Sequence, residues 1–364
     1  MTFTAADARH MARALQLAQR GLYTTDPNPR VGCVIVRDER VVGEGFHRKA
    51  GEAHAEVEAL KQAGELARGA TVYVTLEPCC HHGRTPPCTE ALLASGATRI
   101  VAAMADPNPK VSGRGATRLR ERGVTVDIGL METQSRELNP GFIQRMTNTR
   151  PWIRLKMAAS LDGRTALANG ESKWITGPAA RADAQHWRAR SSAILTGIGT
   201  VLADDPSLTV RDIDSDRQPL RVVLDSKLRM PGKAKMLREQ GKTLIVTTRS
   251  DSRSMETLRT AGAEVTTIAA NGDHVDLKAT LQHLVEREIN EVLVEAGPVL
   301  SGALLREQLI DEMILYYSPS LMGHAERGMF ALPALAQLDE RIGLTLLDTR
   351  VVGNDLRILA KPNY

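Results

Sequence analysis

One histidine and two cysteines constrain this chain more than any other feature. The segment His54-Ala55-Glu56 is followed, after an apolar stretch, by Pro78-Cys79, and an eight-residue insert from Cys80 to Pro87 then leads to Cys88. A tetrahedral zinc used in catalysis takes three protein ligands and leaves the fourth position for water. The sequence therefore predicts a catalytic zinc site with His54, Cys79 and Cys88 as its ligands.

Glu56 is the expected proton carrier of that site. It lies two residues after the histidine, at the expected start of a helix, where it can reach a bound water without contacting the metal. A structural zinc usually has four protein ligands, so three ligands and a glutamate favour catalysis over a structural zinc module. Cys33, in the apolar run Val-Gly-Cys-Val-Ile-Val, is expected to be a buried small side chain.

The His-x-Glu, Pro-Cys and later Cys pattern resembles the zinc-dependent cytidine deaminase superfamily. The usual short Cys-x-x-Cys is lengthened here, and the insert is similar to that of the bifunctional riboflavin-biosynthesis deaminase/reductase family. Other segments resemble the same family in the same order over nearly the whole chain; they are Thr25–Gly32, Ser160–Arg164, Gly170–Thr176, Asp204–Pro206, Leu208–Arg211 and Val294–Pro298.

The resemblance implies two reactions on one small substrate, with Zn²⁺ and NADPH as cofactors. The first would deaminate 2,5-diamino-6-ribosylamino-4(3H)-pyrimidinone 5′-phosphate to 5-amino-6-(5-phosphoribosylamino)uracil. The second would reduce the ribosyl group with NADPH, which gives 5-amino-6-(5-phosphoribitylamino)uracil. An alternative is a nucleic-acid-editing deaminase with an accessory domain, but such an enzyme needs a basic groove that carries aromatic side chains.

In the deaminase part, the resemblance assigns Asn28 and His47 to the pyrimidine pocket. Cys80 adjoins Cys79 and could ligate zinc in its place, but the proline before the ligand is the superfamily pattern and favours Cys79. His81 and His82 could be further ligands or solvated loop residues; for His81, together with Arg84, we prefer a contact to the substrate or its phosphate.

In the reductase part, the resemblance assigns one set of residues to NADPH and another to the substrate. The NADPH set is Ala158, Trp174, Thr200, Asp204 and Ser226. The substrate set is Ser172, Arg188, Leu208, Arg211 and Glu295. The two arginines are suitable phosphate ligands because a guanidinium can bond two phosphate oxygens at once. Lys156 and Glu295 are the candidates for polarisation or proton relay.

The segment from Glu295 to Ala303 follows an expected strand and opens an expected helix. The free N–H groups at such a helix start can hold a pyrophosphate, which makes the segment a candidate NADPH cradle, whereas the alternative is an ordinary strand-to-helix turn. The cradle residues are Gly297, Pro298, Val299, Leu300, Ser301, Gly302 and Ala303.

Composition favours a small phosphorylated substrate over a polymer. The chain has 47 basic and 43 acidic residues without a Lys/Arg run, and only 3% aromatic residues, so nucleic-acid binding is not expected. Four cysteines, two of them assigned to zinc, suit a reducing compartment. No segment resembles a leader or a membrane span. We expect a soluble, cytoplasmic homo-oligomer without a membrane partner.

A length of 364 residues predicts two domains. The family resemblance implies that residues 1–147 form a cytidine-deaminase-like three-layer α/β/α domain and residues 148–364 a dihydrofolate-reductase-like α/β domain. Helix and strand patterns alternate in the first, which a helical stretch from Met131 to about Asn148 closes. The second predicts a mostly parallel sheet with an antiparallel edge formed by Met313–Tyr317, Leu344–Val352 and Leu356–Ala360. Gly197-Ile198-Gly199 lacks the third glycine of a dinucleotide fingerprint, which disfavours a Rossmann domain.

Overall fold

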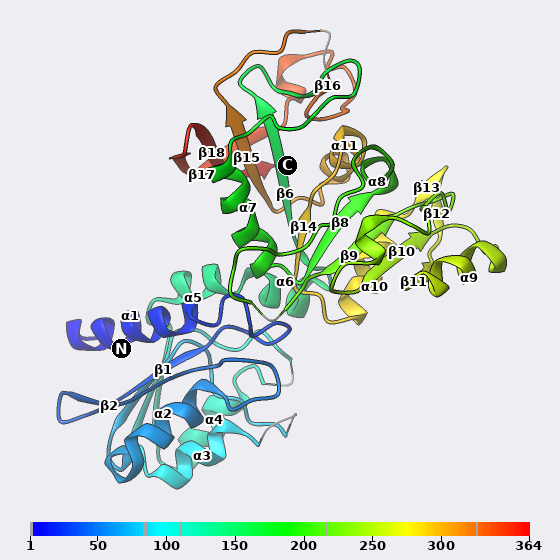
Figure 1. Cartoon of the computed structure of the whole chain (residues 1–364). Coiled ribbons are helices and arrows are strands. Elements are labelled where there is room, and N and C mark those ends of the chain that lie inside the picture. Colours follow the sequence, from blue (N-terminus) through cyan, green and yellow to red (C-terminus); the bar gives the residue numbers. More distant parts are fainter. Residues whose placement is uncertain (1–2, 83–85, 110, 216, 325–326) are drawn as a thin grey trace. The chain divides into compact units, whose positions relative to one another are not determined.

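The computed structural model describes residues 3–82, 86–109, 111–215, 217–324 and 327–364. The chain folds into two compact units, Met1–Thr149 and Arg150–Tyr364, and each unit has its own sheet (Figure 1). No helix among the described residues is both long enough and apolar enough to span a membrane.

The first unit is built on a five-stranded sheet with the strand order β2-β1-β3-β4-β5. Strand β1 pairs antiparallel with β2 and β3, while β3, β4 and β5 run parallel. The strands are β1 (Gly32–Arg37), β2 (Arg40–Phe46), β3 (Thr71–Val74), β4 (Arg99–Ala102) and β5 (Thr125–Ile128). The helices are α1 (Ala5–Gln19), α2 (Ala55–Ala63), η1 (Gly64–Ala67), α3 (Cys88–Ser95), α4 (Arg114–Glu121), α5 (Glu132–Leu138) and α6 (Pro140–Asn148).

Helices cover both faces of this sheet, so the three-layer arrangement is confirmed. Met11, Ala14 and Leu17 of α1 pack with one set of strand side chains. Helices α2, α3 and α4 pack on the opposite face, through residues such as Ala59 and Leu92. Small residues allow the close approach: a Cβ on Gly45 of β2 would lie only 2.4 Å from the carbonyl oxygen of Ala55 at the start of α2. This packing fixes the helix start that carries His54.

Local signals explain most of these elements, with one exception. Thr4 and Asp7 form a capping box that begins α1. The single helix expected from Met131 to Asn148 is instead two helices, α5 and α6. Asn139 lies between them outside helical geometry, and its side chain exchanges two hydrogen bonds with the backbone of Arg30 at 2.7 and 2.9 Å. Pro140, which lacks an N–H, then begins α6.

The second unit is built on a nine-stranded sheet with the order β11-β10-β9-β8-β14-β6-β15-β18-β17. Its pairings are parallel from β11 to β15 and antiparallel at β15-β18 and β18-β17, as expected. The strands are β6 (Trp152–Ser160), β8 (Ala193–Gly197), β9 (Leu220–Leu224), β10 (Thr243–Thr247), β11 (Ala263–Thr267), β14 (Glu291–Val294), β15 (Glu312–Ser318), β17 (Gly343–Val352) and β18 (Asp355–Asn363).

Helices again lie on both faces of the large sheet. One buried cluster includes residues of α10 and α11, and another includes residues of α7, α8 and α9. The helices are α7 (Pro178–Arg190), α8 (Ile198–Asp204), η2 (Lys235–Leu237), α9 (Ser252–Thr260), α10 (Leu277–Glu286), α11 (Pro298–Arg306) and η3 (Leu338–Glu340). Two small ribbons complete the unit, β7 (Arg164–Ala166) with β16 (Arg327–Gly328), and β12 (Ala270–Asn271) with β13 (His274–Val275).

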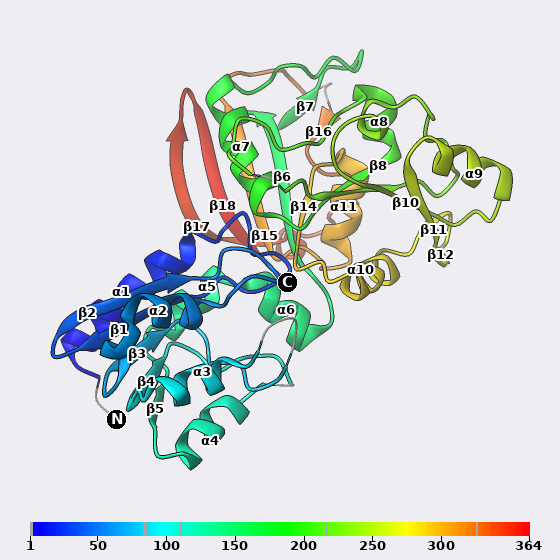
Figure 2. The same ribbon diagram turned by 60° about the horizontal axis from the view of Figure 1, so that its bottom comes forward.

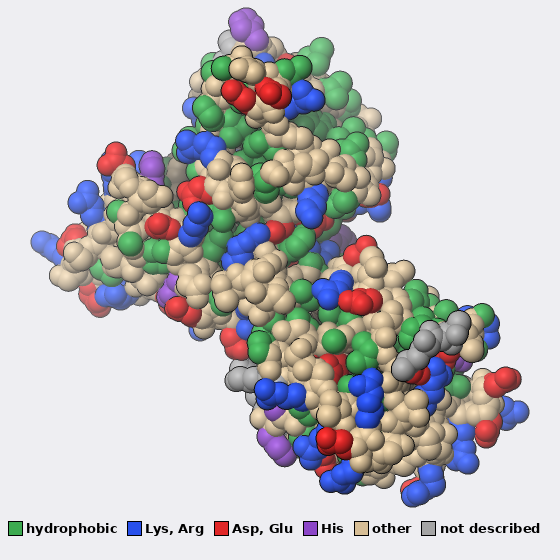
Figure 3. Space-filling model, turned by 180° about the vertical axis from the view of Figure 1, so that it is seen from behind, with side chains coloured by type: hydrophobic (Ala, Val, Ile, Leu, Met, Phe, Trp, Pro, Cys, Tyr) green, Lys and Arg blue, Asp and Glu red, His purple; other side chains and the backbone are tan. Residues whose placement is uncertain are grey.

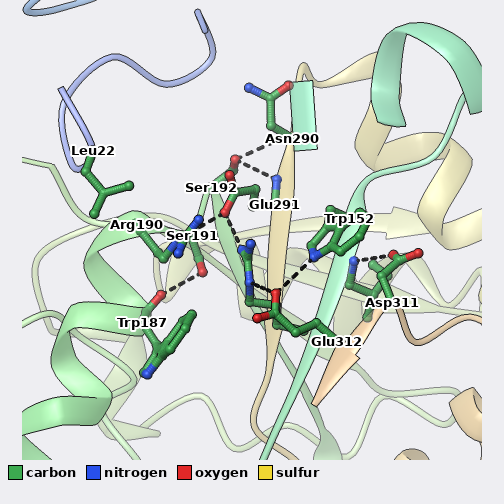
Figure 4. A network of polar contacts seen from close by, with 12 residues as sticks. Leu22, Trp152, Trp187, Arg190, Ser191, Ser192, Asn290, Glu291, Asp311 and Glu312 are labelled. Carbon is green, nitrogen blue, oxygen red and sulfur yellow. Dashed lines mark hydrogen bonds and ion pairs between the residues drawn. The ribbon is translucent and has the colours of Figure 1, made fainter. Parts of the chain in front are cut away.

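A buried polar network ties the amino ends of the central strands together (Figure 4). Arg154 of β6 pairs with Glu291 of β14 and, at 2.6 Å, with Glu312 of β15. The Ser192 hydroxyl accepts hydrogen bonds from the backbone N–H groups of Asn290 and Glu291 at 3.1 and 3.0 Å. These contacts satisfy buried charges and hold three parallel strands in register at their amino ends. The carboxyl ends of the central strands carry the cleft described below.

Candidate metal centre and reductase cleft

His54, Cys79 and Cys88 come together in the first unit. His54 is the residue immediately before α2, Cys88 is the first residue of α3, and Cys79 lies in the loop that follows β3. Their ligand atoms all lie within 4.8 Å of one another. The His54 Nδ1 atom is 3.2 Å from Cys88 Sγ and 3.6 Å from Cys79 Sγ.

These distances fit a shared zinc ion. Zn–N and Zn–S bonds of about 2.0 and 2.3 Å in a tetrahedron place the nitrogen and sulfur roughly 3.5 Å apart. The surroundings also favour a thiolate. A hydrogen bond from the Cys88 thiol, with further contributions from His54 and the Cys88 backbone N–H, lowers the pKa of Cys79 to about 4. The three residues could thus hold a metal without rearrangement of the backbone.

Glu56 lies in the first turn of α2, two residues from His54, and is almost fully buried. Burial raises the pKa of its carboxyl above the ordinary value, and the nearby His54 opposes that shift. A carboxyl whose pKa is moved toward neutrality can both accept and return a proton, which is the requirement for a general acid/base.

Asn28 and His47 also lie beside this centre. The His47 Nδ1 atom is 3.0 Å from the carbonyl oxygen of Ala53, so it carries the proton and donates it. The unprotonated Nε2 then accepts from the Asn28 side-chain amide at 3.0 Å. Burial lowers the pKa of His47, which favours this neutral form, and its ring contacts that of His54 edge-on. The pair therefore presents a fixed pattern of donors and acceptors next to the metal ligands.

The insert is only partly described. Cys80 is partly buried next to Cys79, but it is not part of the group of ligand atoms that lie within 4.8 Å of one another. Burial raises the pKa of the Cys80 thiol, the opposite direction from Cys79. The Nδ1 atom of His81 is buried and has no hydrogen-bond partner among the described residues, whereas His82 is exposed. The expected contact from Arg84 lies outside the described residues.

The second unit contains a cleft of about 820 Å³ at the carboxyl ends of β6 and β14. Most residues assigned to the reductase line this one cleft, although they come from segments far apart in the chain. They are Ala158, Trp174, Thr200 and Asp204 of the NADPH set, Gly297 of the cradle, and Ser172, Arg188, Leu208, Arg211 and Glu295 of the substrate set. The carboxyl edge of a parallel sheet is the usual position of a ligand site in this class of fold.

The deepest charges of the cleft are Lys156, Arg188 and Glu295. The Arg188 guanidinium donates two hydrogen bonds to the Glu295 carboxylate, at 2.5 and 2.8 Å, and a third to the carbonyl oxygen of Thr209 at 3.1 Å. Burial raises the pKa of Glu295, but Arg188, with smaller contributions from Lys156 and Arg211, lowers it to about 2. Glu295 is therefore ionised at neutral pH. Two of the N–H groups of Arg188 are already occupied by the carboxylate of Glu295.

Arg211 and Trp174 remain accessible from the cleft. Arg211 is exposed, and its backbone N–H donates to the Gln185 side chain at 3.0 Å. Trp174 is 70% exposed, and the Arg181 guanidinium lies 4.6 Å from the centre of its ring. An exposed indole at the rim of a cleft offers a flat surface against which a ring can stack.

The start of α11 provides open backbone at the cleft only near Gly297. A Cβ on Gly297 would meet no atom within 4 Å, whereas a Cβ on Gly302 would lie 2.3 Å from the carbonyl oxygen of Ala331. Ser301 is fully buried, and Leu300 and Ala303 pack against the core. Of the expected cradle residues from Gly297 to Ala303, Gly297 alone lines the cleft. The side chain of Val299 is exposed to solvent but is not part of the cleft lining.

Ser226 is the one member of the NADPH set, apart from the cradle residues, that lies outside the cleft lining. It follows β9 by two residues, and its hydroxyl accepts from the backbone N–H of Val275 at 3.0 Å. The cleft also holds a residue that sequence reasoning missed. Tyr316 of β15 lines it, with Lys156 Nζ 5.8 Å from the centre of its ring.

A chain of polar contacts holds Tyr316 in place. Its hydroxyl donates to Asp183 of α7, and Arg357 of β18 donates to both oxygens of the same carboxylate at 2.9 and 2.8 Å. Arg357 also donates to Asp348 of β17 at 3.1 Å. A buried tyrosine inside a strand looks like ordinary core in the sequence, so no local signal could have identified it.

Family models match both units. Residues 151–358 match the model described as the RibD C-terminal domain, which covers more than half of the chain. Residues 4–104 match the cytidine and deoxycytidylate deaminase zinc-binding region. These residue ranges fall on the reductase cleft and on the metal centre, respectively.

Curated relatives and solved structures match over the full length. The riboflavin biosynthesis protein RibD of Escherichia coli (strain K12) is 51% identical, and the alignment covers 96% of this chain and 98% of that protein. A solved structure of Acinetobacter baumannii RibD is 47% identical, with a TM-score of 0.93 and 99% coverage of both chains. The diaminohydroxyphosphoribosylaminopyrimidine deaminase/5-amino-6-(5-phosphoribosylamino)uracil reductase of Thermotoga maritima is 34% identical, with a TM-score of 0.86 and coverage of 98% of this chain and 99% of that one.

Proposed function

The chain belongs to the RibD family of bifunctional riboflavin-biosynthesis enzymes, and on this premise we propose which of its residues perform the two reactions. The protein is a deaminase and a reductase, with zinc and NADPH as its cofactors. It deaminates 2,5-diamino-6-ribosylamino-4(3H)-pyrimidinone 5′-phosphate and then reduces the ribosyl group of the product. We assign residues 1–147 to the deaminase and 148–364 to the reductase.

For deamination, His54, Cys79 and Cys88 would hold zinc, which when bound acidifies a coordinated water so that the nucleophile exists near neutral pH. Glu56 would take a proton from the attacking water and deliver it to the departing ammonia. Its burial supports this role, because a carboxyl with a raised pKa is not held permanently ionised. The single observation that carries the assignment is the convergence of one imidazole and two sulfur atoms within 4.8 Å, next to a buried glutamate.

We assign recognition of the pyrimidine to Asn28 and His47. Their mutual hydrogen bond fixes the orientation of the amide and the tautomer of the imidazole before any substrate arrives. His81 has an unpartnered, buried Nδ1 atom among the described residues, which supports a contact with the substrate. Arg84 lies outside the described residues, and we assign it, together with His81, to a contact with the substrate or its phosphate.

For reduction, NADPH supplies the hydride, and the protein orients it and provides a proton. We assign the proton to Lys156. Glu295, the other candidate, is unsuited as a donor because its pKa of about 2 keeps it ionised. Burial lowers the pKa of Lys156, and the negative charge of Glu295 opposes that shift and so favours the ammonium form. Glu295 therefore acts through Lys156 and through its pair with Arg188.

The remaining cleft residues are assigned by their exposure. Arg211 is the better placed phosphate ligand, since the Arg188 fork already faces Glu295. Ser172 and Leu208 complete the substrate set, and Trp174, Thr200, Asp204 and Ala158 line the same cleft for NADPH. The backbone N–H groups that begin α11 at Gly297 are assigned to the pyrophosphate. A homo-oligomer in the cytoplasm completes the proposal.

The zinc-loaded full chain, incubated with the diaminopyrimidine phosphate, tests the assignment of two separate sites. Without NADPH, ammonia should be released and the deaminated ribosyl product should accumulate. Addition of NADPH should then convert that product to the ribityl compound, with loss of nicotinamide absorbance. Oxidation of NADPH without prior ammonia release would contradict this order, and ammonia release from a cytidine-containing polynucleotide would favour the editing alternative.

A further inference from the structure

One segment of the reductase cleft is held by side chains instead of by secondary structure. Residues 205–215 belong to the described part of the chain and lie in no helix or strand. The segment nevertheless contributes Leu208 and Arg211 to the cleft lining. Because no neighbouring strand satisfies its backbone polar groups, other contacts have to fix the position of Arg211.

Gln218 contacts this segment as a neighbouring strand would. Its side-chain amide accepts a hydrogen bond from the backbone N–H of Val210 at 2.8 Å and donates one to the C=O of Val210 at 3.1 Å. An amide that bonds both groups of one residue copies the pairing of two antiparallel strands. Gln218 lies two residues before β9, so this contact connects the segment to the large sheet.

Helix α7 supplies two further contacts. Gln185 and Arg188 are three residues apart and share one face of the helix, which Figure 1 and Figure 2 both draw alongside β6. Gln185 Oε1 accepts from the backbone N–H of Arg211 at 3.0 Å, and Arg188 donates to the C=O of Thr209 at 3.1 Å. Arg188 also donates to Glu295. The polar groups of the two peptide units that lead into Arg211 are thus all bonded to side chains.

The start of the segment is fixed as well. Leu208 has a φ of 49°, in the left-handed region that a residue with a Cβ adopts at a cost. Its side chain is buried in the core cluster that also contains Ile198 of α8 and Val223 of β9. A conformation of this kind persists only where the surrounding contacts impose it. The backbone from Leu208 to Arg211 therefore has little freedom.

The mixed charges of the cleft make the placement of Arg211 important. Arg211 is adjacent to Asp212, which also lines the cleft, and Lys173 pairs with Asp204 at 3.5 Å. On the face of the molecule drawn in Figure 3, basic and acidic side chains are likewise interspersed. A phosphate is therefore not attracted by a broad positive field, and a guanidinium has to lie at the right point to bond it.

We propose, on the basis of the assignment of Arg211 to the substrate phosphate, that Gln185 and Gln218 are positioning residues of the reductase. They fix the backbone from Thr209 to Arg211 so that the Arg211 guanidinium meets the phosphate of the ribosyl substrate. Each glutamine acts through backbone groups next to Arg211 and needs no contact with the substrate. Loss of either amide would let Arg211 move, and a displacement of about 1 Å is enough to weaken a directed contact severely.

Steady-state kinetics of the zinc-loaded full chain, with the deaminated ribosyl substrate and NADPH, tests the proposal. Gln185→Met and Gln218→Met keep the length of the side chain and remove its hydrogen bonds. Each should raise KM for the substrate about 10-fold to 100-fold, the effect of losing a hydrogen bond to a charged group. The kcat and the KM for NADPH should stay near their wild-type values, because a contact made equally in the ground and transition states changes KM alone. Gln282→Met, the same change at an exposed position of α10, should alter none of these constants.

A double-mutant cycle separates positioning from a general structural role. Arg211→Gln should itself raise the substrate KM. In that background Gln218→Met should have little further effect, because the side chain that it positions has been removed, whereas independent contributions would multiply. The same substrate without its phosphate gives a parallel test. Wild type and Gln218→Met should have equal KM for it, since it offers Arg211 no phosphate to bind.

The outcomes that contradict positioning differ from those that contradict the phosphate assignment. A wild-type KM in both glutamine variants, multiplying effects of Gln218→Met and Arg211→Gln, or an equal rise in KM for the substrate without phosphate would overturn the positioning role and leave Arg211 as a phosphate ligand. A wild-type substrate KM in Arg211→Gln would show instead that Arg211 does not bind the phosphate, and the positioning role would be excluded with it.

Discussion

The carboxylate of Glu295 accepts two hydrogen bonds from the guanidinium of Arg188, at 2.5 and 2.8 Å, at the base of the reductase cleft. This pair uses the bidentate edge of the arginine and keeps the glutamate ionised. We assign the role of proton donor to Lys156, whose pKa burial lowers and Glu295 partly restores.

Replacement of Lys156 by Met should therefore lower kcat for reduction by about 10² to 10⁴, the usual contribution of a general acid. The side chain stays long and apolar, so the packing around Tyr316 is preserved. Reduction should be followed with the deaminated substrate and NADPH, and ammonia release by the same preparation should be unchanged. Lys242→Met, a change at an exposed lysine outside the cleft, is the matched control. Reduction at the wild-type rate would exclude Lys156 as the donor.

The reduction rate should fall as pH rises through the pKa of Lys156, because a general acid must be protonated. Burial lowers that pKa below the ordinary lysine value, Glu295 raises it and Arg188 lowers it. Glu295→Gln removes the only one of these contributions that raises the pKa, so the alkaline limb of kcat should move to lower pH. Glu256→Gln, at an exposed position of α9, should leave the limb in place. An identical limb in wild type and Glu295→Gln would rule out the electrostatic role of Glu295.

Glu56→Gln should retain zinc, but its rate of deamination should fall by a factor of about 10² to 10⁴. The amide keeps the shape of the side chain but cannot take a proton. Metal content and ammonia release are measured on the same sample. Glu58→Gln, two residues further along α2 at a partly exposed position, should have no comparable effect. Near-normal ammonia release by metal-loaded Glu56→Gln is the result that contradicts its role.

Single serine variants of the three neighbouring cysteines should divide into two classes. Cys79→Ser and Cys88→Ser should lose most of the bound zinc, since each removes one of three ligands. Cys80→Ser should keep it, and serves as the control for the same chemical change one residue away. Zinc retained by Cys79→Ser but lost by Cys80→Ser would reverse the ligand assignment.

Gly297→Val should weaken NADPH binding without unfolding the protein. The new side chain would enter open space, since a Cβ there meets no atom within 4 Å, but it would stand where the pyrophosphate is expected to approach the backbone. NADPH titration measures the effect, and deamination should continue. Gly232→Val, equally unobstructed but outside the cleft, is the control. Equal NADPH affinity in both variants would remove the cradle from the start of α11.

Local chemistry explains why the metal centre could be predicted. His54 precedes α2 and Cys88 begins α3, and both helix starts are visible as short patterns in the sequence. The alternation of helix and strand likewise predicted the three-layer arrangement and the antiparallel edge of the second sheet. Such signals depend on neighbours within a few residues, so they can be recognised in the sequence without knowledge of the fold.

The remaining features depended on contacts between distant parts of the chain. Arg188 and Glu295 are both charged residues of ordinary appearance, and only the fold reveals that their side chains pair with each other. The side chain of Asn139 reaches back to Arg30 and divides the expected last helix of the first unit.

The sequence by itself determined the ligand types, the element types and the family. Only the tertiary structure decided which side chains meet and which apolar residues remain exposed. β17 shows the difference most clearly: its residues predict a strand, but its place at the edge of the sheet follows from the pairing of β18 with β15. Strand order is set by burial summed over the whole sheet, and a local pattern of hydrophobic residues does not contain that sum.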